Sequence, residues 1–403
     1  MGFLRFLFEN AQWLAAGFLL TLLSSFGQTF FISIFAGEIR ETFGLSHGQW
    51  GLYYTIGTGA SAALMIWAGG LSDRFRTRVL GAVVLLMLSA GALFMALNTM
   101  ALLLPLVVFA LRFSGQGMTS HIAVVSMSRW FIATRGRALS VATLGVTLGE
   151  ALLPLTMVSL MITVSWRHLW MGVAGVCLAA IPLLVLLLRQ ERTPQSHAEQ
   201  DHSTGMEGRH WRRPEMLRHW LFWFMVPALL GPAAFNTAFF FHQVHFADVK
   251  GWSHLELVAL FPFYSGTAIT AMALSGILLD RFGTARMIPW YQLPMVAGFA
   301  LFGLGQSLTS TLIGLAFVAL TSGANATLPN AFWAEFYGTR NLGAIKAMAV
   351  SVMVLGSALG PGLTGGLIDL GIGLQLQYVG VAVYFIVATA CMVIGVNRAK
   401  HLI

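Results

Sequence analysis

The sequence predicts an all-α membrane protein, in which twelve transmembrane helices form two pseudo-symmetric six-helix bundles. The first reason is composition, because hydrophobic residues make up 57% of the 403 residues and only 9% are charged. The mean hydropathy of +0.77 excludes an ordinary soluble domain. The second reason is a series of apolar runs of membrane-spanning length, and the third is an internal repeat that divides the chain into halves.

Twelve apolar runs are long enough to cross a bilayer, since about 20 helical residues span its hydrocarbon core. The predicted spans cover approximately residues 11–36, 48–69, 79–98, 101–125, 138–163, 168–188, 219–243, 254–276, 287–306, 311–333, 346–368 and 377–396. Cys177 and Cys391 fall inside the sixth and twelfth spans, where we expect buried, unreactive thiols.

A charged turn follows the second span and recurs after the eighth. The two copies are Gly69-Gly-Leu-Ser-Asp73-Arg74-Phe-Arg76-Thr-Arg78 and Gly276-Ile-Leu-Leu-Asp280-Arg281-Phe282-Gly283-Thr284-Ala-Arg286. Because charge is costly in hydrocarbon, each copy lies at a membrane face. About half of the chain separates the two copies, and the same interval separates Gly44 from Gly251, Ser46 from Ser253, His47 from His254 and Gly59 from Gly266. We therefore predict bundles at 1–188 and 219–403, joined by a flexible cytoplasmic linker at 189–218.

The distribution of positive charge predicts the topology. All but four of the 23 Lys and Arg residues fall on one side of the predicted membrane. Arg40, Arg167 and Lys250 lie on the other side, and Arg112 lies within a span. Since cytoplasmic loops carry the excess of positive charge, we expect both termini in the cytoplasm and the protein in the cell inner (plasma) membrane. The formal charge of +8 therefore reports topology and does not indicate a nucleic-acid partner.

Two short patterns predict where helices begin. Ser46-His-Gly-Gln49 and Ser253-His-Leu-Glu256 are capping boxes, in which the serine oxygen and the fourth side chain satisfy backbone N–H groups. They open the second and eighth spans and place His47 and His254 at the outer membrane surface. Terminal packing and a pH-sensing role both remain open for these histidines.

Polar side chains inside the first, seventh and tenth spans are candidates for substrate binding. Thr21, Ser24, Ser25 and Gln28 form one polar stripe on the first span. Asn236 takes the place of Gln28 in the second half, which suggests two sides of one central site. Asn325 lies in the tenth span, which has no counterpart of Arg112. The alternative for such groups is hydrogen bonding between helices.

The fourth and fifth spans carry the two charged side chains that lie deep in the predicted membrane. By the helical period, Arg112, Gln116 and Thr119 share one face. Arg112 and Glu150 are equally distant in sequence from Phe131, so two antiparallel helices place them at similar depth. We expect Arg112 and Gln116 to bind substrate and Glu150 to couple transport to protons. The alternative is a structural Arg112–Glu150 ion pair.

Glycine and proline mark the fifth and eleventh spans as candidate hinges. The rows Gly145-x-x-x-Gly149 and Gly356-x-x-x-Gly360 allow close approach of neighbouring helices. Pro154 and Pro361 follow them and interrupt the helical hydrogen bonds.

The duplicated turn resembles the signature loop of the major facilitator superfamily of secondary transporters, Gly-x-Leu-x-Asp-Arg-x-Gly-Arg-Arg. The matching gating residues are Gly69, Asp73, Arg74 and Arg78 in the first copy and Gly276, Asp280, Arg281 and Gly283 in the second. The copies depart from it at Arg76, Thr77, Thr284 and Ala285. Arg112, Gly115 and Gly117 resemble the superfamily's Arg-x-x-Gly-x-Gly element on the fourth helix.

The resemblance implies two bundles around a central cavity and transport by alternating access. It also implies that the loop braces the bundles together in one state, with the Asp73 carboxylate against a helix N-terminus of the other half.

The function expected from these features is secondary active transport of a small solute, not enzymatic catalysis. The chain has no phosphate-binding Gly-x-x-x-x-Gly-Lys-Ser/Thr run and no catalytic triad or metal-ligand cluster. We expect no cofactor or metal, and a monomer whose partners are the bilayer, a small-molecule substrate and protons. Arg112 favours a small organic anion, and the fourth, fifth and eleventh spans weakly resemble the monocarboxylate and oxalate–formate branch.

Two alternatives remain. Proton-driven efflux of amphipathic compounds is supported by the aromatic spans and by Pro361-Gly-Leu-Thr-Gly365-Gly366, which is similar to a motif of some drug antiporters. The other is a transporter-like solute receptor or sensor.

Overall fold

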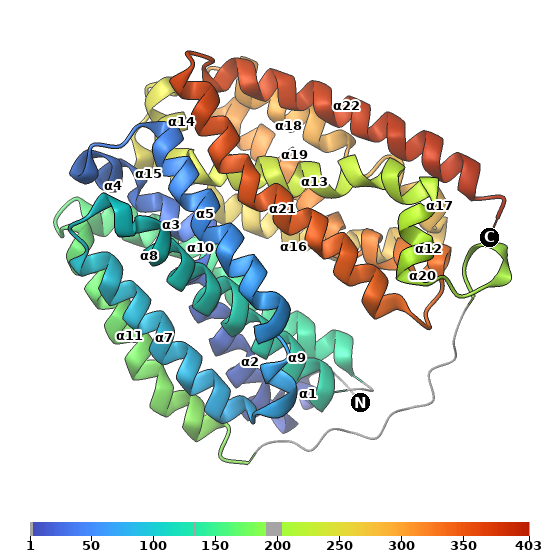
Figure 1. The fold of residues 1–403 in the computed structure, drawn as a ribbon, viewed down its shortest axis with the longest axis horizontal. Helices are drawn as coiled ribbons and strands as arrows, with labels where there is room; N and C mark the ends of the chain where they lie inside the picture. The colour runs from blue at the N-terminus through green and yellow to red at the C-terminus, as the bar shows by residue number, and fades with distance from the viewer. Residues whose placement is uncertain (1–2, 132–133, 191–203, 403) are drawn as a thin grey trace. The chain divides into compact units, whose positions relative to one another are not determined.

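The computed structural model describes residues 3–131, 134–190 and 204–402, and within these ranges all regular structure is helical. The chain divides into two compact units (Figure 1). Unit 1 comprises Met1–Gln200 together with Phe240–His245, and unit 2 comprises Asp201–Phe239 and Phe246–Ile403. The predicted fold class, an all-α membrane protein, is confirmed.

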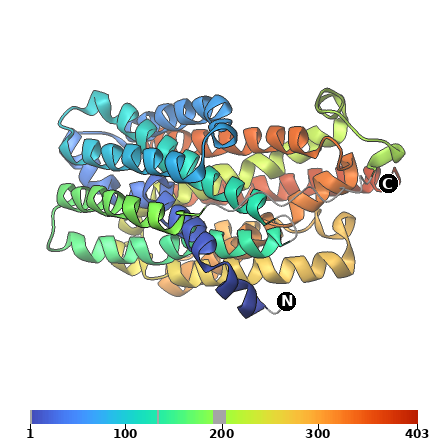
Figure 2. The same ribbon diagram turned by 90° about the horizontal axis from the view of Figure 1, so that it is seen from below.

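Unit 1 is built from the first half of the chain. Its elements are α1 (Phe3–Glu9), α2 (Ala11–Ser24), η1 (Ser25–Gly27), α3 (Thr29–Ile32), η2 (Ser33–Phe35), α4 (Ala36–Phe43), α5 (His47–Ala68), α6 (Leu71–Arg74), α7 (Thr77–Leu97), η3 (Ala101–Leu103), α8 (Leu104–Leu111), η4 (Arg112–Thr119), α9 (Ser120–Trp130), α10 (Arg135–Met161) and α11 (Trp166–Leu187). The helices of each unit run side by side along their length, as α7 and α11 do (Figures 1 and 2).

Unit 2 is built from the second half. Its elements are η5 (Met206–Gly208), α12 (Arg213–Arg218), α13 (Trp220–Phe241), α14 (Gln243–Lys250), α15 (His254–Val258), α16 (Phe261–Phe282), α17 (Thr284–Met287), α18 (Leu293–Leu304), α19 (Leu308–Asn325), α20 (Leu328–Tyr337), α21 (Leu342–Asp369) and α22 (Leu374–Ala399). The end of α13 and the start of α14 belong to unit 1.

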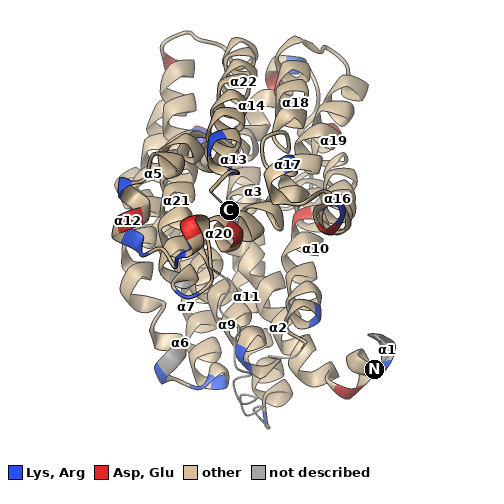
Figure 3. Ribbon diagram, turned by 90° about the vertical axis from the view of Figure 1, so that its right-hand side faces the viewer, with Lys and Arg blue, Asp and Glu red and all other residues tan. Residues whose placement is uncertain are grey.

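Among the described residues, nine helices are long and apolar enough to cross a membrane, or ten if one bent pair counts as a single span. Over most of their length the helices carry no charged residue (Figure 3). Two of the twelve predicted spans are not in this set. α5 is a continuous helix of 22 residues, but its apolar sequence contains glycine, threonine and tyrosine. The predicted span 287–306 contains a turn followed by the 12-residue helix α18.

The two glycine rows are close helix contacts, as predicted. A Cβ on Gly145 would lie 2.7 Å from the backbone nitrogen of Leu22, so α10 packs directly against α2. In unit 2, a Cβ on Gly360 would lie 2.9 Å from the carbonyl carbon of Ala234, so α21 packs against α13 in the same way. Both helices are continuous through Pro154 and Pro361, and a hinge role remains a prediction.

Both predicted capping boxes are confirmed. The Gln49 backbone N–H donates to Ser46 Oγ at 3.0 Å, and the Glu256 N–H donates to Ser253 Oγ at 3.2 Å. In each box, the side chain of the later residue accepts from the serine N–H. The local pattern was sufficient because all partners lie within four residues.

The linker prediction is too long at its C-terminal end. Residues 191–203 lie outside the described residues, but 204–218 pack onto unit 2. Met206, Trp211 and Met216 are buried in the hydrophobic core of that unit. The Trp211 backbone N–H also donates to the Tyr337 carbonyl at 3.1 Å. Apolar side chains spaced along a polar segment therefore anchor it.

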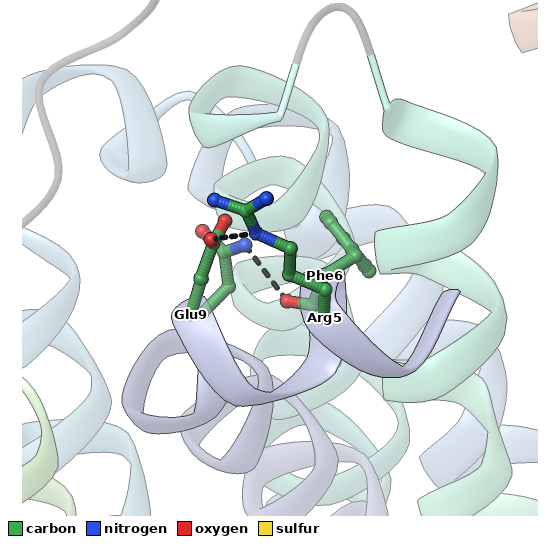
Figure 4. A network of polar contacts seen from close by, with 4 residues as sticks. Arg5, Phe6 and Glu9 are labelled. Atoms are coloured by element: carbon green, nitrogen blue, oxygen red, sulfur yellow. Dashed lines mark hydrogen bonds and ion pairs between the residues drawn. The ribbon is translucent and has the colours of Figure 1, made fainter. Parts of the chain in front are cut away.

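The N-terminal helix α1 makes polar contacts on its exposed side and apolar contacts on its buried side (Figure 4). On its exposed side, Arg5 Nε pairs with Glu9 Oε1 at 2.7 Å. Phe6 is buried, and its ring lies edge-on to Phe131 at a centroid distance of 5.7 Å. Asn10 Nδ2 donates to the Phe6 carbonyl at 2.8 Å, which satisfies the helix end before α2 begins.

Candidate functional site

The first membrane span of unit 1 is broken at Gln28. The segments Ala11–Gly27 and Thr29–Phe43 are bent by 48° relative to each other. Gln28 adopts an extended conformation with φ −82° and ψ 155°, so the helical hydrogen-bond ladder is interrupted there. Backbone carbonyls near such a break need other donors, because a membrane supplies none.

Arg112 provides one of these donors. Its Nη1 donates to the Gly27 carbonyl at 3.2 Å and to Thr29 Oγ1 at 3.3 Å, and only 2% of the residue is exposed. Thr29 Oγ1 also hydrogen-bonds the Tyr54 hydroxyl at 2.5 Å. The guanidinium carbon lies 5.5 Å from the centroid of the Tyr54 ring, within cation–π range. The broken helix and the buried cation therefore stabilise each other.

The remaining edge of the guanidinium has no hydrogen-bond partner among the described residues. Nε is buried without a hydrogen-bond partner among the described residues, and no hydrogen bond of Nη2 to them is recorded. Nε and Nη2 together form an edge of the guanidinium that binds a carboxylate in two places. Burial of the Nε donor without an acceptor costs free energy, so this edge is the strongest indication of a ligand site.

Arg112 begins a π-helix, η4, which no pattern in the sequence predicts. In a π-helix the hydrogen bonds join residues five apart, and such segments are frequent at functional sites. Thr119 Oγ1 accordingly donates to the Ser114 carbonyl at 2.6 Å and is fully buried. The α-helical period that placed Thr119 on the face of Arg112 and Gln116 does not apply to this segment.

The wide turn of η4 brings its backbone against the break. A Cβ on Gly27 would lie 2.7 Å from Gly115 Cα, and one on Gly115 would lie 2.8 Å from the Gly27 nitrogen. Only glycine at both positions allows this approach. Gly27 and Gly115 are the sequence signal that could have indicated it.

Gln28 and Gln116 lie next to this contact. Both are half-buried, and no side-chain hydrogen bond is recorded for either within the described chain. Their amides can therefore donate to and accept from a ligand. The structure is compatible with the predicted binding roles, which remain a proposal.

Glu150 lies on α10, which packs against the same break. A Cβ on the preceding Gly149 would lie 2.8 Å from Ser25 Cβ, in η1. η1 therefore contacts both the element that carries Arg112 and the element that carries Glu150. The partners recorded for the Arg112 guanidinium within the described residues do not include Glu150. The structural ion pair that was the alternative prediction is thus not formed in this structure.

The corresponding helix of unit 2, α13, runs unbroken through Asn236. Asn236 Nδ2 donates to Ser322 Oγ on α19 at 3.0 Å, and the Tyr264 hydroxyl donates to the same oxygen at 3.0 Å. Asn236 Oδ1 is buried, with no donor to it among the described residues. Neutral groups thus occupy the place that Arg112 and a broken helix occupy in unit 1.

Asn325 belongs to a second neutral cluster in unit 2. Its Oδ1 accepts from the Tyr291 hydroxyl at 3.2 Å, and that hydroxyl accepts from Gln292 Nε2 at 2.8 Å. Gln292 Nε2 also donates to the Ala228 carbonyl at 2.6 Å. No sequence pattern identifies Tyr54, Thr29, Tyr264 or Gln292, because only tertiary packing brings them to these groups.

The first gating loop is held by α9 of the same unit. His121 Nε2 lies 3.0 Å from the Gly69 carbonyl, and Arg129 Nη1 donates to the Ser72 carbonyl at 2.8 Å. Arg74 is exposed and Arg78 is half-buried. The side chain of Asp73 lies outside the described residues, so its predicted role stays a prediction.

The second gating loop has a different conformation. α16 continues through Asp280 and Arg281, both exposed, and Gly276 lies within it. Gly283 ends the helix with φ +75°, a conformation that favours glycine. The first loop has Arg76 near this point and adopts an ordinary extended conformation there.

No group of three or more potential metal ligands is found within the described residues. The site is therefore built from one buried cation, amides, hydroxyls and aromatic rings. Side chains of these kinds can bind and orient a polar solute.

Comparison with known proteins places this geometry in a family. The family model of the Major Facilitator Superfamily matches residues 17–291, which is more than half of the chain. No curated protein matches the sequence significantly. Structures similar to this one include a bacterial homolog of the human lysosomal transporter Spinster, inward-facing and unoccupied, with a TM-score of 0.73 and 17% identity over 97% of this chain and 98% of that chain.

The structure of the nucleoside transporter NupG is also similar, with a TM-score of 0.67 and 15% identity over 96% of this chain and 98% of that chain. At such identities the likeness shows the fold alone. The family model, the helical architecture and the duplicated loop agree, and the multi-pass membrane protein described here belongs to the major facilitator superfamily of transporters.

Proposed function

We propose that the protein is a secondary transporter of small organic anions, such as monocarboxylates, which it moves by alternating access coupled to protons. The observation that carries this proposal is the unused edge of Arg112. A buried guanidinium whose Nη1 is held by Gly27 and Thr29 presents Nε and Nη2 in a fixed orientation. A carboxylate completes both hydrogen bonds and neutralises the charge.

The energetic argument supports a ligand in preference to a purely structural role. Insertion scales place the cost of arginine at the centre of a membrane helix at about 2.5–3.5 kcal/mol. One Nη1 donor would suffice to satisfy the carbonyl at the break. The cost of the remaining charge is offset when an anion binds, and Gln28 and Gln116 supply neutral hydrogen bonds to the rest of the substrate.

We assign Asn236 and Asn325 of unit 2 a role in selectivity among substrates. Both carry amide oxygens in neutral hydroxyl-rich clusters, and Asn236 Oδ1 lacks a donor among the described residues. They therefore recognise hydrogen-bond donors on a solute. Charge recognition belongs to unit 1.

The test of anion recognition is counterflow of radiolabelled lactate, formate and oxalate into proteoliposomes, compared for the wild type, Arg112→Lys and Arg167→Lys. Lysine keeps the charge but loses the planar fork, so we expect Arg112→Lys to lower the apparent affinity by about tenfold or more. Arg167 donates to the Ala96 and Asn98 carbonyls, away from the break, and its substitution is the matched control.

The outcomes separate the alternatives. Counterflow by the wild type excludes a receptor or sensor that binds without transport. Uridine serves as a neutral solute, since a nucleoside transporter is among the similar structures. Normal transport of the acids by Arg112→Lys would contradict bidentate recognition and favour the efflux alternative.

We assign Glu150 to proton coupling. Its helix and that of Arg112 both pack against η1. An anion neutralises Arg112, and η1 links this change to the helix that carries Glu150. Substrate and proton then bind together, which is the requirement for symport.

Glu150→Gln tests this assignment, because glutamine resembles the protonated carboxyl. We expect exchange of labelled lactate across the membrane to continue, while accumulation driven by a pH gradient is abolished. Glu38→Gln is the control, since Glu38 is also half-buried but lies on α4, beyond the break. Continued accumulation by Glu150→Gln would show that the coupling group lies elsewhere.

A further inference from the structure

Six residues of the chain pack with the opposite half of the sequence. Phe240–His245 belong to unit 1, although the residues on both sides of them belong to unit 2. They comprise the last two residues of α13, His242 and the first turn of α14. We call Phe240–His245 the docked segment.

Polar contacts hold the docked segment to the first span. Gln243 Nε2 donates to Ser33 Oγ at 2.8 Å and to the Phe30 carbonyl at 3.1 Å. Ser33 Oγ lies 2.6 Å from the Phe240 carbonyl. Both Gln243 and Ser33 are fully buried. Their hydrogen bonds therefore form without competition from water.

Ser33 has two acceptors for one proton. Its Oγ lies 2.7 Å from the Thr29 carbonyl, one helical turn earlier, as well as 2.6 Å from Phe240 O. A hydroxyl can donate its single hydrogen fully to only one of them. Ser33 therefore has an acceptor within its own segment, the Thr29 carbonyl, besides the Phe240 carbonyl.

Aromatic packing connects the docked segment to the Arg112 site. The Phe241 ring stacks on Trp50 at 5.6 Å with an interplanar angle of 24°, and lies 4.6 Å from the Tyr54 ring. Tyr54 in turn bonds Thr29 Oγ1, which accepts from Arg112 Nη1. Thr29 and Tyr54 therefore touch both the cation and the residues that hold the segment.

We infer that the docked segment is a latch whose attachment to unit 1 is coupled to the Arg112 site through Thr29 and Tyr54, an inference that rests on the function proposed above. Thr29 is a positioning residue for Arg112. With the segment attached, Phe241 fixes the Tyr54 ring, Tyr54 fixes Thr29, and Thr29 holds Nη1 so that Nε and Nη2 face the anion. Release of the segment loosens this series of contacts and lowers the affinity for the anion.

Disulfide trapping measures attachment directly. A Cβ on Gly37 would lie 3.4 Å from Val244 Cγ1, so cysteines at these two positions are neighbours that oxidation can cross-link while the segment is docked. The parent protein is Gly37→Cys/Val244→Cys with Cys177→Ala and Cys391→Ala. The rate of oxidative cross-linking in proteoliposomes then reports the docked population without requiring any substrate.

We expect Gln243→Leu, Thr29→Val and Arg112→Lys each to slow cross-linking by about threefold or more. The double variant Thr29→Val/Arg112→Lys should be no slower than the single ones, because both changes break the same link. Tyr54→Phe, which removes one hydroxyl, provides a milder change if Thr29→Val does not fold. Thr143→Val is the matched control, because its hydroxyl bonds carbonyls of its own helix.

Two results would overturn the inference. Unchanged cross-linking in Gln243→Leu means that the segment is not held as a latch. Slower cross-linking in Gln243→Leu with unchanged rates in both Thr29→Val and Arg112→Lys means that the latch is not coupled to the cation. Neither result depends on anion transport, whose failure would appear separately in the counterflow assay.

Discussion

The corresponding helices of the two halves of the duplication differ in structure. In unit 1 the first span breaks at Gln28, and a buried arginine donates to the freed carbonyl of Gly27. In unit 2 the corresponding helix α13 continues through Asn236, whose amide bonds a serine hydroxyl. Irregular backbone and a charged side chain thus occur together in one half, and regular backbone with neutral groups in the other.

This difference separates what the duplication retained from what it changed. The capping boxes and the glycine contacts between α2 and α10 and between α13 and α21 are the same in both units. These features determine how helices begin and pack. The polar interior diverged: the buried Arg112 lies in unit 1, and Asn236 with a serine hydroxyl lies in the corresponding part of unit 2.

Among the tests of this difference between the units, the largest effect is expected for Gly27→Ala. Its Cβ would meet Gly115 Cα and the Gln116 nitrogen within 2.8 Å, and backbone atoms cannot move aside as a flexible side chain can. We expect a loss of about 1–3 kcal/mol of stability, measured by thermal unfolding in detergent. Gly59→Ala, with no atom within 4 Å of its Cβ, is the control and should be neutral. Equal stability of the two variants would contradict the close contact at the break.

A smaller effect sharpens the comparison at the gating loops. The first loop is held by Arg129, whose Nη1 donates to the Ser72 carbonyl, whereas Arg281 of the second loop is exposed and lies 5.4 Å from the Phe282 ring. A hydrogen bond from a charged group contributes about 1.5–3 kcal/mol. We expect Arg129→Ala to slow turnover several-fold with little change in KM, and Arg281→Ala to have no measurable effect. Similar turnover in both variants would show that the asymmetry has no role in transport.

The smallest effect is expected for Asn236→Ala in unit 2. Hydrogen bonds between membrane helices contribute about 0.6 kcal/mol on average, so the unfolding temperature should fall only slightly. If Asn236 contributes selectivity and not charge recognition, the apparent affinity for lactate should change less than in Arg112→Lys. Counterflow with both variants measures this ratio. A loss equal to that of Arg112→Lys would place charge recognition in both units.

The sequence by itself determined the features that depend on near neighbours or on composition. Apolar content predicts membrane helices, and the capping boxes involve partners within four residues. The glycine rows were identifiable because their spacing alone exposes a flat helix surface. Arg112 was recognisable as a functional candidate because the cost of a charge in hydrocarbon is independent of its partners.

The tertiary structure alone decided the features that depend on distant partners. The π-helix at Arg112 and the break at Gln28 form against each other, and neither segment carries a sequence period that specifies them. Thr29 and Tyr54 became parts of the site only by meeting Arg112. Residues 204–218 pack onto unit 2, and Phe240–His245 onto unit 1, because buried apolar and hydrogen-bonded contacts outweigh the order of the chain. The energy of packing between distant segments determines these features, and no local sequence pattern predicts it.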